Sequence, residues 1–211
     1  MKVVCISDTH GKHYEIESIP DGDLLVHAGD FSLRGDLVEA ELFAEWFGNQ
    51  PHKHKVAIAG NHDLSVIHYG SRLIREIFED NGVHYLQDTS VEIMGHLVHG
   101  SPWQPYFHNW AFNLKTEEEL YDRFEQAQIG TDILITHGPP LGVLDNNKHG
   151  ESCGSSALLK RIREIEPKLF VCGHIHESRG VSKIGTTKCV NASCVDLRLN
   201  ILRSPAIVVE I

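Results

Sequence analysis

The sequence has no cysteine pattern that would build a disulfide framework. Its five cysteines are an odd number, and no two of them form a C-x-x-C pair. Three of the five, Cys5, Cys172 and Cys189, lie in apolar stretches, where cysteine acts as a small hydrophobic residue. We therefore expect a protein with reduced thiols, of the kind found in the cytoplasm.

Long hydrophobic runs are also missing from the sequence. No apolar stretch approaches the ~18 residues that a membrane-spanning helix needs. The chain starts with Met1-Lys2 and soon reaches a polar Asp8-Thr9-His10 motif, and we therefore expect no signal peptide. We expect no membrane partner.

Positive charge is scarce. Lysine and arginine number 19 against 29 acidic residues, which gives a formal net charge of −10. Proteins that bind nucleic acid nonspecifically are normally basic, because they neutralise backbone phosphates. We therefore expect no binding of long nucleic acid, although an acidic enzyme still binds a small phosphate ester where a metal ion supplies local positive charge.

The pattern that is present is an alternation of short apolar runs and helical periodicity. The 211 residues, 41% of them hydrophobic, fit one domain over 1–211 with a sizeable core and no repeat or linker. Strands are predicted over 2–7, 23–28, 56–59, 83–86, 90–94, 97–100, 132–136, 168–172, 188–192 and 206–211. Helices are predicted over 36–47, 71–80, 116–129 and 155–165. This order predicts an α/β fold.

Five of the predicted strands end in polar clusters of one design. These clusters are Asp8-x-His10, Gly29-Asp30, Gly60-Asn61-His62-Asp63, His137-Gly138 and Gly173-His174-x-His176. In open α/β sheets, ligands bind at the carboxyl ends of the strands. Each cluster alone is also compatible with a polar turn, and His27, inside a predicted strand, is expected to be a hydrogen-bonded core residue.

Two of the clusters contain residues spaced two apart. In extended backbone, Asp8 and His10 project to the same side, as do His174 and His176. A carboxylate with an imidazole, or two imidazoles, can chelate one metal ion. The spacing therefore predicts two pairs of metal ligands.

Taken together, the five clusters resemble the metallophosphoesterase (calcineurin-like phosphoesterase) superfamily. The resemblance spans positions 8 to 176, and the clusters occur in the same order as in the family. The sequence Gly-Asp-Phe-Ser at 29–32 is most similar to the small metallophosphoesterase-domain (239AB-like) branch. The resemblance implies a four-layer α-β-β-α sandwich of two mixed sheets flanked by helices, with a two-metal site at the carboxyl ends of the strands.

The resemblance also implies the ligands. One metal ion would be bound by Asp8, His10, Asp30 and His176. The second would be bound by Asp30, Asn61, His137 and His174, with Asp30 bridging. Oxygen and imidazole ligands suit Mn, Fe, Zn or Ni, and we expect Mn to serve in vitro. By the same resemblance, two such cations would lower the pKa of a water held between them, and the resulting hydroxide would attack phosphorus.

His62 and Asp63 are the catalytic residues that the resemblance implies. His62 would face the substrate phosphate, and Asp63 would fix the orientation of the His62 ring. The alternative for His62 is a hydrogen-bonded turn residue. One position departs from the family pattern: the second acid expected three residues after Asp30 is Leu33, followed by Arg34, which we expect to pair with Asp36.

An aromatic loop over 101–113 is the candidate substrate contact. Its Trp103 and Phe107 would stack on a ring of the substrate, or else the aromatics would only pin the loop to the protein. The polar stretch 141–154 is predicted to be a mobile lid or a wall.

The expected activity is hydrolysis of phosphodiesters such as cyclic nucleotides or small aryl or nucleotide diesters, by a monomer or homodimer. A phosphomonoesterase, a nuclease acting on short oligonucleotides and a non-catalytic metal-binding scaffold are the alternatives.

Overall fold

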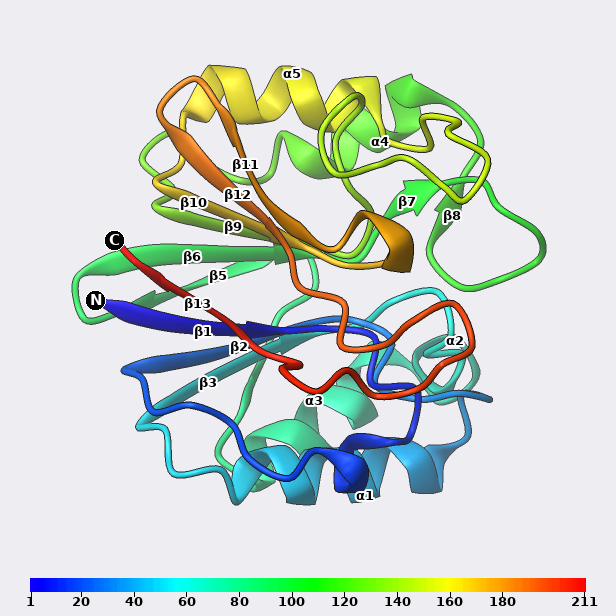
Figure 1. Ribbon diagram of the computed structural model, residues 1–211, viewed down its shortest axis with the longest axis vertical. Coiled ribbons are helices and arrows are strands. Elements are labelled where there is room, and N and C mark those ends of the chain that lie inside the picture. The colour runs from blue at the N-terminus through cyan, green and yellow to red at the C-terminus, as the bar shows by residue number, and fades with distance from the viewer.

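The computed structural model describes residues 1–211 as two mixed β-sheets between two layers of helices (Figure 1). The first sheet has the strand order β13 (Ile207–Glu210), β1 (Lys2–Ile6), β2 (Leu24–Ala28), β3 (His54–Ile58), β4 (His84–Tyr85). The second has the order β11 (Gly180–Ile184), β12 (Thr187–Asn191), β10 (Leu169–Cys172), β9 (Ile133–Thr136), β6 (His96–Ser101), β5 (Thr89–Ile93). A short ribbon pairs β7 (Gln104–Pro105) with β8 (Asn113–Leu114).

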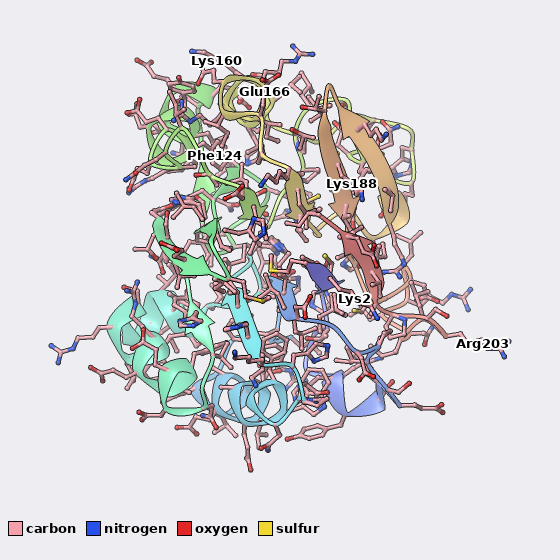
Figure 2. All side chains as sticks on the ribbon, turned by 90° about the vertical axis from the view of Figure 1, so that its left-hand side faces the viewer. Lys2, Phe124, Lys160, Glu166, Lys188 and Arg203 are labelled. Carbon is pink, nitrogen blue, oxygen red and sulfur yellow. The ribbon has the colours of Figure 1, made fainter.

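The helices divide between the two outer faces. Those on the side of the first sheet are α1 (Leu37–Gly48), α2 (Ser65–Tyr69) and α3 (Ser71–Asp80), whereas α4 (Glu117–Phe124) and α5 (Ser156–Ile165) cover the second sheet (Figure 1). Two 3₁₀ turns, η1 (His13–Glu15) and η2 (His176–Ser178), complete the elements. In the side view, Lys160 of α5 lies at the end of the molecule opposite α1 (Figure 2).

Three layers of apolar side chains hold the four layers together. The central strands β1, β2, β3, β9, β10 and β12 are buried on both faces, because each sheet packs on helices and on the other sheet. Val26 and Val171, for example, lie in the core between the sheets, whereas Phe43 of α1 lies in the core of the first helical side and Phe170 of β10 in the core that includes α5. The predicted sandwich is confirmed.

Most predicted elements are found where the sequence placed them. The helix predicted over 116–129 is an exception, because α4 ends at Phe124. Beyond Phe124 the N–H groups of Gln126 and Ala127 donate to carbonyls only three residues back, so the chain leaves the α-helix. The guanidinium of Arg161 on α5 binds the carbonyl oxygens of Glu125 and Ala127, at 3.2 Å and 2.7 Å, and stabilises this ending. The edge strand β11 and the ribbon β7–β8 were not predicted.

The start of α1 also corrects one expectation. Asp36 caps the helix by accepting the N–H of Glu39 at 2.8 Å, and the Glu39 carboxylate in turn accepts backbone N–H groups, including that of Arg34. The carboxylate of Asp36 is therefore committed to the cap, and no ion pair with Arg34 forms. The predicted Arg34–Asp36 pair is wrong.

The Phe43→Ala substitution tests the packing under α1. Phe43 is fully buried and lies against Phe31 and Phe47, with ring centroids 5.2 and 5.3 Å away. Removing a buried aromatic ring should lower the free energy of unfolding by about 3–5 kcal/mol in urea denaturation. Val38→Ala on the exposed face of the same helix should change it by less than about 0.5 kcal/mol, and equal losses would contradict the packing described.

Candidate metal centre

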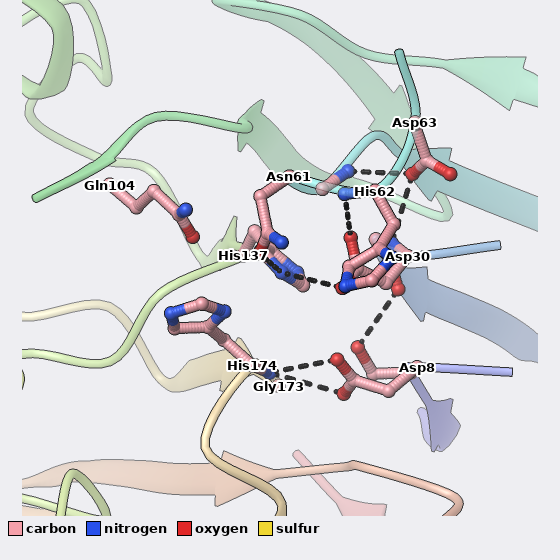
Figure 3. Close-up of polar contacts among 12 residues, drawn as sticks. Asp8, Asp30, Asn61, His62, Asp63, Gln104, His137, Gly173 and His174 are labelled. Carbon is pink, nitrogen blue, oxygen red and sulfur yellow. Dashed lines mark hydrogen bonds and ion pairs between the residues drawn. The ribbon is translucent and has the colours of Figure 1, made fainter. Parts of the chain in front are cut away.

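Loops from both sheets converge at the carboxyl ends of β1, β2, β3, β9 and β10. Backbone hydrogen bonds hold these loops to one another: Asp8 N–H donates to the Gly29 carbonyl at 2.9 Å, and His10 N–H donates to the Asp30 carbonyl at 3.0 Å. In the second sheet, Gly173 N–H donates to the His137 carbonyl at 3.0 Å. The ends of five strands thereby form one rigid frame (Figure 3).

The backbone at this frame is strained. Asp8, His10, Asp30 and His174 all have positive φ, at 55°, 45°, 58° and 66°. Such a conformation costs on the order of 1 kcal/mol or more for a residue other than glycine, and it concentrates at functional sites. The expectation that Asp8 and His10, or His174 and His176, project from extended backbone is therefore wrong, and His176 begins a 3₁₀ turn.

The first group of donors comes from opposite ends of the chain. Asp8, His10 and His176 place their ligand atoms within 4.8 Å of one another. His10 Nε2 lies 3.3 Å from His176 Nε2 and 3.8 Å from Asp30 Oδ2. Two imidazole nitrogens that face each other and two carboxylates match a site for a divalent ion, because a cation between them would accept all of their lone pairs.

The second group is built on Asp30. His137 Nε2 lies 3.4 Å from Asp30 Oδ2 and 3.0 Å from Asn61 Oδ1. The other ring nitrogen of His137 donates its hydrogen to the carbonyl of Ala28 at 2.9 Å, because a carbonyl can only accept. Nε2 is thereby directed at the oxygen donors. Asp30 Oδ2 also lies 3.8 Å from His10 Nε2, which is the position that a carboxylate bridging two ions would take.

His174 is the one predicted histidine ligand that belongs to none of the close donor groups. Its backbone N–H donates to both carboxylate oxygens of Asp8, at 3.0 and 3.1 Å. Its ring lies 5.0 Å from that of His137, between centroids, on the side of the centre that faces Phe107. The backbone of His174 is therefore part of the frame, while its ring borders the second group.

The electrostatics of the centre require a compensating positive charge. Asp8 and Asp30 are almost completely buried. Burial would raise their pKa values, but the nearby histidines, chiefly His176 for Asp8 and His137 for Asp30, hold both carboxyl pKa values below the usual range. Buried carboxylates need paired charges, and divalent ions would supply them. The residues present therefore fit the metal ions that the sequence implies.

His62 lies directly beside this centre. Its Nδ1 donates to the carbonyl of Leu33 at 2.9 Å, and its backbone N–H donates to Asp30 Oδ1 at 2.8 Å. The ring of Trp110 stacks on it at 4.2 Å between centroids and an interplanar angle of 28°. The His62 ring is therefore held on one edge and one face, which leaves Nε2 to face a substrate.

Asp63 has a different position from the one expected. Its carboxylate accepts hydrogen bonds from the backbone N–H groups of Gly60, Asp30 and Ser32, at 2.7, 2.9 and 2.9 Å, and from the Ser32 hydroxyl at 2.6 Å. It does not contact the His62 ring, whose orientation is set by the Leu33 carbonyl. The expected contact is wrong, and Asp63 instead fixes the loop that carries Asp30.

Gly60 is a residue of the centre whose role the sequence analysis did not assign. A Cβ on Gly60 would lie 2.3 Å from Asp30 Oδ1 and 2.6 Å from His137 Cε1, so no larger residue fits between these side chains. A glycine that ends an apolar strand before a polar cluster is the sequence signal for such a close approach. Trp110 was also missed as a contact of His62, because stacking between segments so far apart leaves no local pattern.

The two predicted substrate contacts separate in the structure. Phe107 lines a pocket of about 650 Å³ that is also lined by His174, Lys148 and His149. Trp103 does not line it: its indole N–H donates to Asp88 at 2.8 Å, with the Arg123 guanidinium 4.6 Å from the ring centroid. Trp103 pins the loop to the protein, which was the alternative for these aromatics.

The stretch 141–154 forms a wall of the same pocket. Asp145, which is buried, accepts hydrogen bonds from the backbone N–H groups of Gly142 and Gly154, at 2.9 and 3.1 Å, and from the Ser152 hydroxyl. The carbonyl of Asn146 accepts the hydroxyl of Ser178, on the turn that begins with His176, at 2.7 Å. The wall is thus tied to the metal centre.

Comparison with known proteins gives the same family. A family model described as calcineurin-like phosphoesterase matches residues 1–178. The chain is 39% identical over 229 residues to human metallophosphoesterase domain-containing protein 1, covering 98% of this chain and 70% of the relative. It is 36% identical to UPF0046 protein C25E10.12 of Caenorhabditis elegans, covering 98% of this chain and 80% of that one.

The fold has solved counterparts. The crystal structure of TT1561 from Thermus thermophilus superposes with a TM-score of 0.65 at 13% identity, covering 91% of this chain and 88% of that one. At this identity the likeness supports the fold alone. None of the helices in the structure has the length and apolar character to cross a membrane.

The ion pair between His137 and Asp30 predicts how protein stripped of metal responds to pH. Burial would lower the pKa of His137, but Asp30 and Asp8 outweigh it and raise this pKa to about 9. The protonated imidazole therefore stabilises the fold fully below about pH 6.5 and loses that effect as the pH rises through about 9. With a chelator present, Tm should fall by a few degrees between pH 7 and 9.5.

Metal-loaded protein and the His137→Gln variant are the controls for this measurement. A bound cation takes the position of the proton on His137, so the loaded protein should not show the fall. The variant has no group to titrate there, so its chelated form should show a smaller fall. Burial would lower the pKa of His176, but Asp8 raises it, so His176 accounts for the remainder. A wild-type chelated protein whose Tm is constant over this range would contradict the assignment.

Proposed function

The chain belongs to the calcineurin-like phosphoesterase family, and we propose that within this family of metal-dependent phosphoester hydrolases it acts as a phosphodiesterase. The observation that carries the proposal is the pocket beside His174, where Tyr106 and Phe107 are half-exposed. A phosphodiester has a second organic group that needs such a surface, whereas a phosphomonoester has none. No arginine lines the pocket, although arginine is the side chain best suited to bind the extra charge of a monoester.

Divalent ions bound by the seven ligand residues would supply a nucleophile at neutral pH and neutralise charge on the phosphoryl oxygens. The ligands would be Asp8, His10, Asp30, Asn61, His137, His174 and His176, with manganese as the ion that serves in vitro. The protein holds these side chains on strained loops that cannot move apart independently. It therefore supplies a preorganised centre at which a phosphoryl group is positioned for attack.

His62 would transfer the proton to the leaving oxygen. Its Nδ1 hydrogen is committed to the Leu33 carbonyl, so the exchangeable proton must be carried on Nε2. Trp110 keeps water from one face of the ring, and Asp30 holds the backbone of His62 beside the centre. A histidine fixed in this way can donate from Nε2 to a substrate oxygen without rotating.

We further propose small phosphodiesters, including cyclic nucleotides and aryl diesters, as substrates, with Phe107 stacking on a ring of the organic group. The net charge of −10 disfavours long nucleic acid as a partner. A single domain acting as a monomer or homodimer in the cytoplasm is the setting that these features favour.

The His62→Ala substitution tests the proton-transfer step. Turnover of a diester by the manganese-loaded protein should fall by about 10²–10⁴-fold, because general acid catalysis contributes that much. Metal content and Tm should remain those of the wild type. His84→Ala, at an exposed histidine on β4, is the matched control and should leave turnover unchanged. Unchanged turnover in His62→Ala would remove His62 from the reaction.

The substrate class is tested with two chromogenic esters that share a leaving group. Bis-p-nitrophenyl phosphate should be hydrolysed with a higher kcat/KM than p-nitrophenyl phosphate, because only the diester has a second aryl group to bind in the pocket while the first one leaves. Phe107→Ala should raise the KM for a cyclic nucleotide by about tenfold, as expected for the loss of one stacking contact. Trp103→Ala, outside the pocket, should leave this KM unchanged in protein that remains folded. A preference for the monoester would identify a phosphatase instead.

A further inference from the structure

Gln104, on β7, has a buried carbonyl without a hydrogen-bond partner. The residue is fully buried, and its Oε1 is among the buried side-chain atoms that no donor contacts. Figure 3 shows its amide pointing from the ribbon toward the space between Asn61, His137 and His174. A buried acceptor at the edge of a metal centre needs an explanation, because buried polar groups are nearly always paired.

The orientation of this amide follows from a chain of hydrogen bonds. Asn113 Nδ2 donates to the carbonyls of Phe107 and His108, both at 3.0 Å, and carbonyls only accept, so its nitrogen is identified. The remaining oxygen of Asn113 therefore accepts, and the Gln104 atom 3.1 Å from it must be the donor Nε2. The carbonyl of Gln104 is thus the end of the amide that faces the centre.

His174 is short of an acceptor at the same place. A histidine that ligates a metal through one ring nitrogen almost always donates the other N–H to a fixed oxygen. Among the predicted ligands His137 does so to Ala28, whereas Nδ1 of His10 is buried without a partner. The hydrogen bonds of His174, in contrast, come from its backbone N–H, and its ring lies outside the close donor groups.

We propose that Gln104 is the positioning residue for the ring of His174. In the loaded protein, the Gln104 carbonyl accepts the N–H of His174 and thereby turns the other ring nitrogen toward the second ion. The inference rests on the proposed two-ion centre. Asn113 would then have a role as well, because its side chain links the backbone of the aromatic loop at Phe107 and His108 to the amide of Gln104.

The Gln104→Met substitution tests this role because it keeps the length of the side chain and removes the acceptor. Manganese binding, followed by calorimetric titration and by metal content per chain, should show a second ion bound about 10–100-fold more weakly and a first ion bound as in the wild type. Gln104→Glu, which keeps an acceptor oxygen, should bind the second ion with an affinity close to that of the wild type. Gln126→Met, at an exposed glutamine, should bind both ions normally.

Two further readouts separate positioning from a structural role. The Tm of metal-free Gln104→Met should fall by no more than the loss of the one hydrogen bond from Nε2 to Asn113 explains, because the carbonyl has no partner to lose. In zinc-loaded wild type, the His174 imidazole N–H, assigned from its absence in His174→Gln, should exchange slowly in NMR spectra, and in Gln104→Met it should exchange rapidly.

The outcomes distinguish this inference from the function on which it rests. Wild-type protein that binds two ions, together with Gln104→Met that binds both with equal affinity, would overturn the role of Gln104 alone. A glutamate variant as weak as the methionine variant would also overturn it. Wild-type protein that binds fewer than two ions would overturn the two-ion centre itself.

Discussion

The structure depends on the burial of two carboxylates, Asp8 and Asp30, at the junction of the two sheets. Carboxylates buried there without a compensating charge would destabilise the folded protein by several kcal/mol. Here the imidazoles of His10, His137 and His176 surround them at 3.4–3.8 Å from the nearest carboxylate oxygen. The negative charge of Asp8 and Asp30 makes this site suitable for divalent cations. The histidines come from both sheets, so their ion pairs with the two carboxylates also hold the sheets together.

Backbone strain and its compensation explain why the ligands stay in position. Positive φ at four of the seven predicted ligands would relax if the loops were free. Asp63 prevents this in the loop of Asp30 by accepting backbone N–H groups on either side, and Asp8 does the same for His174 by accepting its N–H. Each carboxylate therefore fixes a neighbouring ligand, and the centre is a network in which no side chain is placed by its own loop alone.

Much of the fold could be predicted from the sequence because its strands are continuous apolar runs with glycine and polar residues at their ends. The edge strand β11 was not predicted because it contains a serine and a lysine and its residues alternate in exposure. The end of α4 was not predicted because it involves contacts with Arg161 of another helix. The spacing of Asp8 and His10 predicted that their side chains lie close together, as they do, but it assumed extended backbone where the structure has positive φ. Trp110 and Gln104 could not be predicted, since long-range stacking and an unpaired acceptor leave no trace in spacing.

The most direct test of the account is the number of metal ions that one chain binds. Protein reconstituted with manganese and freed of excess metal should contain two ions per chain by elemental analysis. Asp30→Asn, which weakens the donor shared by both groups, should reduce the content of both sites together. A wild-type content well below two ions per chain, in protein that is folded and has not lost its ligands to oxidation, would contradict the two-metal centre on which the function was built.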